Sequence, residues 1–144
     1  MSQEYSKKEK SGFQPELDAN RLCAHTTHIL VNRKYFPEEV QQTIVPKVVE
    51  LVLGIAEKTN VANSIDVRPT LPKEQLSANY KHRIRLQNDV IKDIKLLKSQ
   101  IRVFKLGYHL RAHKANSWTR LANETLASIT SWRDSETKSL YSLL

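Results

Sequence analysis

The chain has 144 residues, a length that predicts one domain able to bury a core without a metal ion or a disulfide. Hydrophobic residues make up 40% of the sequence and there are only three glycines, which argues against an intrinsically disordered chain and favours α-helices. Lysine and arginine outnumber aspartate and glutamate by 23 to 15, and the net charge of +8 favours a polyanionic partner such as RNA, DNA or an acidic protein.

A single cysteine, Cys23, rules out an intrachain disulfide, so an oxidising compartment has no support. The polar N-terminus lacks the apolar segment of a secretory signal. No stretch approaches the roughly 20 apolar residues of a transmembrane helix. We therefore expect a soluble, cytoplasmic protein that does not act at a membrane.

The first half of the chain predicts two helices and a short helical turn. Residues 1–14 are expected to form a flexible basic lead, and a first helix follows over about residues 15–33, with a proline and acidic side chains in its first turn. Pro37 ends this helix and opens a short turn. A second helix is expected over about residues 43–58, with Pro46 near its first turn. Its apolar residues surround it, which predicts a subunit interface there.

The second half predicts a loop and two long helices. The loop is expected at residues 59–72, the third helix from residue 73 to 104 or 106, and the fourth helix over about residues 112–135. Residues 136–144 are expected to form a C-terminal tail. Together the helices predict an all-α, antiparallel four-helix bundle over residues 15–135.

The stretch 81–106 of the third helix, which Gly107 should end, has two faces of opposite character. At helical spacing an arc about 80° wide is apolar and predicts the core-facing side. That arc consists of Leu86, Val90, Ile94, Leu97, Ile101 and Phe104. The opposite arc is basic and consists of Lys81, Arg85, Lys92, Lys95 and Arg102.

No aspartate or glutamate interleaves on the basic arc, so its cations repel one another unless a partner neutralises them. We predict that this face binds the phosphate groups of a nucleic acid, with Arg111, Lys114 and Arg120 as further contacts. Few aromatic residues lie nearby, so stacking on single-stranded bases is not indicated.

Arg83 and Gln87 interrupt the apolar side of the same helix. A cation there must be paired or must lie beyond the end of the core. Two interpretations remain open: a structural hydrogen-bond pair near a helix end, or an anion contact at a subunit interface.

The sequence offers little that could carry out catalysis. His109 and His113 are spaced to share one helix face, as are His25 and His28, but neither pair has a third and fourth metal ligand at helical spacing. No Ser-His-Asp signature, Gly-rich phosphate loop, HExxH or CxxC pattern occurs. We predict no metal, no cofactor and no enzymatic activity.

Several motifs between residues 22 and 135 resemble a four-helix-bundle family. The family includes the accessory variability determinant of diversity-generating retroelements and the proteins encoded by intervening sequences of large-subunit ribosomal RNA genes. The matching features are the step from Arg83 to Gln87, Leu106-Gly107-Tyr108, Trp118-Thr119-Arg120-Leu121, Trp132 with Arg133 and Ser135, Phe36-Pro37, and Thr59-Asn60. Two features depart from the family: Arg111 stands where it often has Ser or Thr, and the loop at 59–72 looks long.

The resemblance implies a basic homopentameric barrel that binds a reverse transcriptase and its template RNA, or an RNA/DNA product, and supports mutagenic cDNA synthesis without catalysing it. A different class of function also fits the sequence. An oligomeric adaptor could use the same basic face to dock an acidic protein, with no nucleic acid involved.

Overall fold

The computed structural model describes residues 13–144, and residues 1–12, most of the predicted basic lead, lie outside this range. The described residues form helices and no strand, which confirms the all-α class. The helices are α2 (Gln14–Leu30), α3 (Glu38–Thr43), α4 (Val45–Ser64), α5 (Lys73–Gly107) and α6 (Ala112–Tyr141).

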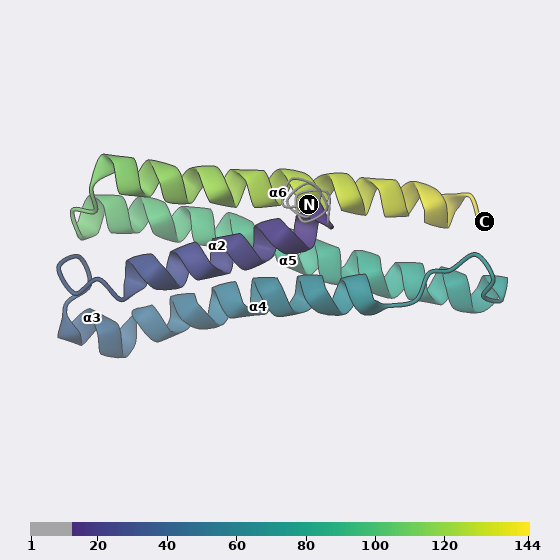
Figure 1. Cartoon of the computed structure of the whole chain (residues 1–144), viewed down its shortest axis with the longest axis horizontal. Helices are drawn as coiled ribbons and strands as arrows, with labels where there is room; N and C mark the ends of the chain where they lie inside the picture. Colours follow the sequence, from purple (N-terminus) through teal and green to yellow (C-terminus); the bar gives the residue numbers. More distant parts are fainter. Residues whose placement is uncertain (1–12) are drawn as a thin grey trace, which may run out of the picture.

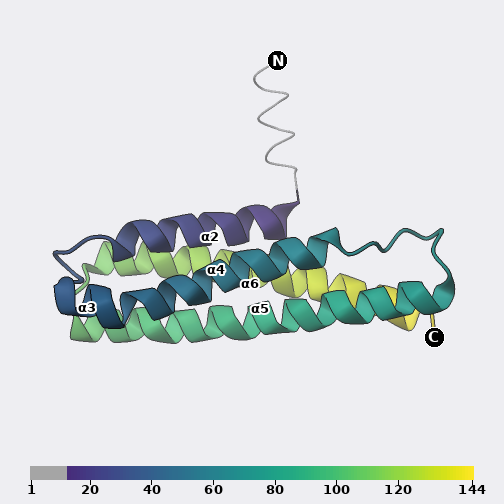
Figure 2. The ribbon, with the colours of Figure 1, turned by 90° about the horizontal axis from the view of Figure 1, so that it is seen from below.

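The four long helices pack side by side (Figures 1 and 2). Helix α5 packs against α4 and α6, and α2 packs against the same two helices, so the contacts close a cycle around one core. The connections from α2 to α4 and from α5 to α6 lie at one end of the molecule, and the loop from α4 to α5 lies at the other (Figure 1).

Prolines mark the beginnings of four helices, as their fixed φ angle and missing N–H predict. Pro15 and Pro46 occupy the first turns of α2 and α4, and Pro72 directly precedes α5. The short helix after Pro37 is also present as α3. Gly107 is the last residue of α5, but the left-handed residue of the following turn is His109, with φ of 53°.

Three predicted boundaries are wrong, each because of a contact that the sequence pattern does not show. Helix α2 ends at Leu30, not residue 33, because the chain turns there and the Phe36 N–H bonds to the Asn32 carbonyl at 3.0 Å. Helix α4 continues through Ser64 and shortens the predicted loop, since Ala62 is buried against its neighbours. Helix α6 continues past residue 135 to Tyr141, because Glu136 is buried in an ion pair.

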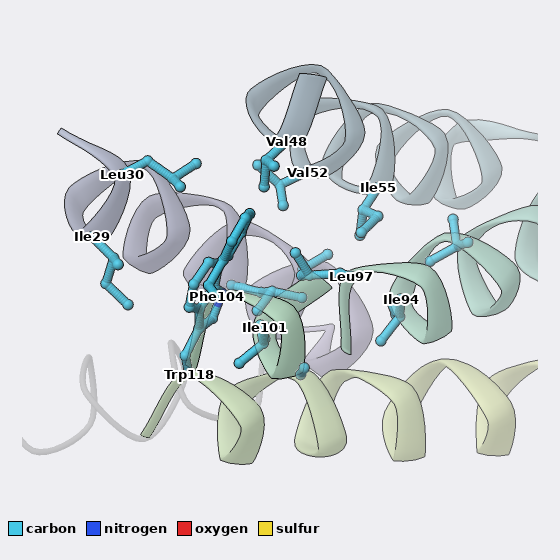
Figure 3. Packing of buried hydrophobic residues seen from close by; sticks show 14 of the residues in the cluster. Ile29, Leu30, Val48, Val52, Ile55, Ile94, Leu97, Ile101, Phe104 and Trp118 are labelled. Atoms are coloured by element: carbon cyan, nitrogen blue, oxygen red, sulfur yellow. The ribbon is translucent and has the colours of Figure 1, made fainter. Parts of the chain in front are cut away.

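The core runs along the axis between the four long helices (Figure 3). It contains the predicted apolar arc of α5, of which Leu86 alone remains partly exposed while Val90, Ile94, Leu97, Ile101 and Phe104 are buried. Trp118 is fully buried and its indole N–H donates to the Thr26 hydroxyl at 2.8 Å. This bond ties α6 to α2 near one end of the bundle.

Candidate nucleic-acid interface

The five predicted cations of α5 all lie on its exposed side. They are Lys81, Arg85, Lys92, Lys95 and Arg102. Because one continuous helix carries them, the row extends over about 30 Å at a rise of 1.5 Å per residue. Within residues 13–144 none of them takes part in an ion pair, and Arg102 donates only to the Ser99 hydroxyl, at 3.0 Å.

The nearby acidic residues of α5 do not neutralise this row. Asp93 accepts a bond from the Lys58 ammonium of α4 at 2.9 Å, which places its charge in the contact between α4 and α5. Asp89 is exposed and forms no ion pair within the described range. The outer face of α5 therefore keeps an excess of positive charge that side-chain pairing does not remove.

Apolar side chains share this outer face, a feature that the charge pattern alone did not predict. Leu96, Val103 and Leu106 are 50%, 59% and 81% exposed. At 100° per residue they project among the cations, on the side opposite the core. Their spacing of seven and then three residues was the available sequence signal. A face with basic and apolar groups can contact a protein as well as a phosphate backbone.

The three further candidates lie on α6 or directly before it, apart from the row on α5. Arg111 precedes the first turn of α6 and is exposed, as is Arg120. Lys114 is half-buried, and its ammonium lies 5.6 Å from the centre of the Tyr35 ring, a cation–π contact. The positive charges of Arg120 and Lys114 also lower the pKa of the His25 imidazole, so both act on the side of α6 that faces α2.

The contacts of Arg83 are structural, so of its two interpretations the buried hydrogen-bond pair is correct and the anion contact is not. Its Nε donates to the Glu136 carboxylate of α6 at 2.8 Å, and its Nη1 donates to the Ile65 carbonyl, also at 2.8 Å. Gln87 donates to the same carboxylate at 2.6 Å, and the Arg83 guanidinium lies 5.3 Å from the centre of a Trp132 ring. The Arg83 side chain is only 7% exposed, so it is not available to an external anion.

The histidine pairs do not assemble a metal site. His109 lies in the turn after α5, and His113 lies on α6. Across residues 13–144, no group of three or more His, Cys, Asp or Glu side chains is arranged to hold a metal ion.

Burial, reinforced by the Glu57 carboxylate, raises the pKa of the Cys23 thiol, which disfavours the reactive thiolate.

Among the described helices, none combines the length and apolarity that crossing a membrane needs.

Comparison with protein-family models, with curated proteins and with solved structures found no match to this chain. The resemblance to the retroelement accessory family therefore stays a prediction.

Proposed function

We propose that this protein is a non-catalytic, basic accessory protein that binds RNA or an RNA/DNA duplex through the outer face of α5. In this proposal it works in the cytoplasm with a reverse transcriptase and supports cDNA synthesis in a diversity-generating retroelement. The observation that carries nucleic-acid binding is the row of exposed, unpaired cations along one helix. The reverse transcriptase and the retroelement rest on the sequence resemblance alone.

Charge neutralisation supplies the mechanism. Free cations along a helix repel one another, and phosphate groups remove that repulsion while counterions leave the nucleic acid. Such contacts fix position and orientation but do not read sequence. The protein would thus hold an RNA backbone along a rigid helix for a partner enzyme.

We also propose that the chain assembles as a homopentameric ring of antiparallel four-helix bundles. Support for a subunit contact comes from α4, where Leu53 and Val61 are 45% and 49% exposed although the helix is apolar on several sides, whereas the number of five subunits rests on the sequence resemblance alone. An open groove borders Leu53 and reaches Asp93 of α5. Burying this surface against another subunit would remove it from water, and a ring would repeat the basic row around its circumference.

RNA affinity measured against salt concentration tests the nucleic-acid role. Removing one cation that binds a phosphate should reduce the slope of log affinity against log salt by about one unit. We expect Lys92→Glu combined with Arg102→Glu to weaken RNA binding and flatten the slope. As a matched control, Lys73→Glu combined with Lys138→Glu reverses two cations outside the candidate row. Absence of RNA binding at low salt, or equal effects of the two double variants, would refute the proposal.

A second candidate function is an adaptor that docks an acidic protein, and the exposed apolar residues among the cations favour it. Leu106→Ser removes the most exposed of them and leaves every charge in place. An acidic amphipathic peptide should bind the adaptor through both kinds of group and bind this variant more weakly. RNA binding, which depends on phosphate contacts, should be unchanged by Leu106→Ser.

A further inference from the structure

Four basic groups gather where α2 packs against α6. His25 and His28 come from α2, and Lys114 and Arg120 come from α6. The hydrogen bond between Trp118 and Thr26 holds the two helices in this alignment. Helix α2 packs against α4 and α6 and makes at most marginal contact with α5, so this cluster is separate from the basic row of α5.

The cluster has no acidic partner that forms an ion pair within residues 13–144. Lys114 contacts the Tyr35 ring, and Arg120 is exposed. The neighbouring charged residues are Arg21, one turn before His25 on α2, and Glu124, one turn after Arg120 on α6; both are exposed and unpaired in that range. The excess charge is therefore positive, and it surrounds a half-buried imidazole.

The surroundings of His25 enclose part of its imidazole ring and disfavour its protonation. Its Nε2 atom is enclosed and has no hydrogen-bond partner within the described residues. Burial lowers the pKa of the His25 imidazole, and the positive charges of His28, Arg120 and Lys114 lower it further. Without a bound anion, protonating His25 would add one more positive charge to a group that already repels.

We infer that the cluster formed by His25, His28, Lys114 and Arg120 binds a phosphate group. Lys114 and Arg120 supply positive charge, whereas the His25 imidazole gains its charge only when an anion is present or the solution is acidic. Binding at this site therefore strengthens as pH falls.

The identity of the phosphate rests on the proposed function, in which it belongs to an RNA backbone. The chemistry of the cluster would equally accept a small free anion. Sulfate is a suitable small probe because its charge does not change in the range where histidine titrates.

Protonation and anion binding must be linked. An anion near His25 favours the imidazolium and so raises the pKa of this side chain. For every unit by which binding raises that pKa, the affinity gains a factor of about ten on moving from high to low pH. Since RNA phosphodiesters stay ionised throughout, such a gain can be assigned to groups on the protein.

The test is an NMR titration of the imidazole signals of the full chain against pH. It is run in chloride, in sulfate at matched ionic strength, and with an RNA oligonucleotide. We expect both sulfate and RNA to raise the pKa of His25 by about one unit relative to chloride. RNA affinity should also rise about tenfold between pH 7.5 and pH 5.5, and His25→Gln should remove most of that rise.

A matched control is His109→Asn, which removes an imidazole from outside the cluster and suits the left-handed backbone at that position. This variant should keep the pH dependence of the wild type. RNA that binds without moving the pKa of His25 would overturn the inference while leaving the proposed function intact. If RNA does not bind at all, the proposed function fails and the sulfate arm decides: a raised pKa identifies a site for small anions, and an unchanged pKa overturns the inference.

Discussion

Glu136→Gln is the sharpest test of how the bundle is held together. The Glu136 carboxylate accepts bonds from the Arg83 guanidinium, including one of 2.8 Å, and a bond of 2.6 Å from the Gln87 amide. The two charged side chains are 7% and 10% exposed. The substitution keeps the size and shape of the side chain but removes its charge, so Arg83 would remain buried without a counter-ion.

Removing one member of a buried ion pair costs about 3–5 kcal/mol, because the remaining charge is left uncompensated and cannot regain water. Part of this cost is offset, since Arg83 keeps its bond to the Ile65 carbonyl and its contact with Trp132. We therefore expect about 3 kcal/mol, the lower end of the range. This is a large share of the roughly 5–15 kcal/mol by which a domain is stable.

Urea unfolding followed by circular dichroism measures this cost. With a urea dependence of about 2 kcal/mol per molar, the midpoint should fall by about 1.5 M. The combined variant Arg83→Met, Gln87→Leu and Glu136→Leu should be destabilised much less, because apolar side chains of similar size leave neither a buried charge nor an unpaired amide of Gln87. A destabilisation below about 1 kcal/mol in Glu136→Gln, or a combined variant as unstable as the single one, would refute this account.

Three further perturbations probe other parts of the fold. Trp118→Phe leaves the buried Thr26 hydroxyl without its donor and should cost about 1–3 kcal/mol by urea unfolding, and adding Thr26→Val should recover part of that stability. Phe36→Ala empties a fully buried site whose ring lies 5.3 Å from that of Phe104, so thermal or urea unfolding should show a destabilisation of about 3–5 kcal/mol. The pKa of His25 is lowered in the folded chain, so the unfolded chain binds more protons in acid. The contribution of His25 to the free energy of unfolding should therefore be fully present above pH 6.5 and should be lost as pH drops below it. His25→Gln should flatten that fall in a series of unfolding curves recorded at different pH values.

Local periodicity was sufficient to predict most of the fold. The prolines at the beginnings of helices and the apolar arc of α5 depend on neighbours in the sequence, and both predictions agree with the structure. The ends of α4 and α6 could not be predicted in the same way. The extension of α6 depends on Glu136 meeting Arg83, a residue 53 positions earlier in the chain. A polar residue near a helix end looks like the start of a tail until its distant partner is known.

The candidate site likewise has one part that the sequence pattern predicts and another part that it does not. The exposure of Lys92 and Arg102 follows from their position opposite the core, which the sequence pattern supplies. The grouping of Lys114 and Arg120 with His25 does not, because it depends on how α2 and α6 align in space. Periodicity within one helix can find a row of charges, but it cannot find a cluster built across two helices.

The buried polar group and the exposed basic row also depend on each other. Arg83 lies between Lys81 and Arg85 in the sequence but faces the opposite side of α5, so its bond to Glu136 fixes the rotation of the helix there. A turn of 100° about the helix axis, one residue of register, would separate Arg83 from its carboxylate and carry Lys81 and Arg85 toward a neighbouring helix. A purely apolar contact would resist such a rotation less, because many rotations bury similar area, whereas a buried ion pair has one satisfactory geometry. The residue that interrupts the apolar face is therefore the one that keeps this end of the basic face directed at solvent.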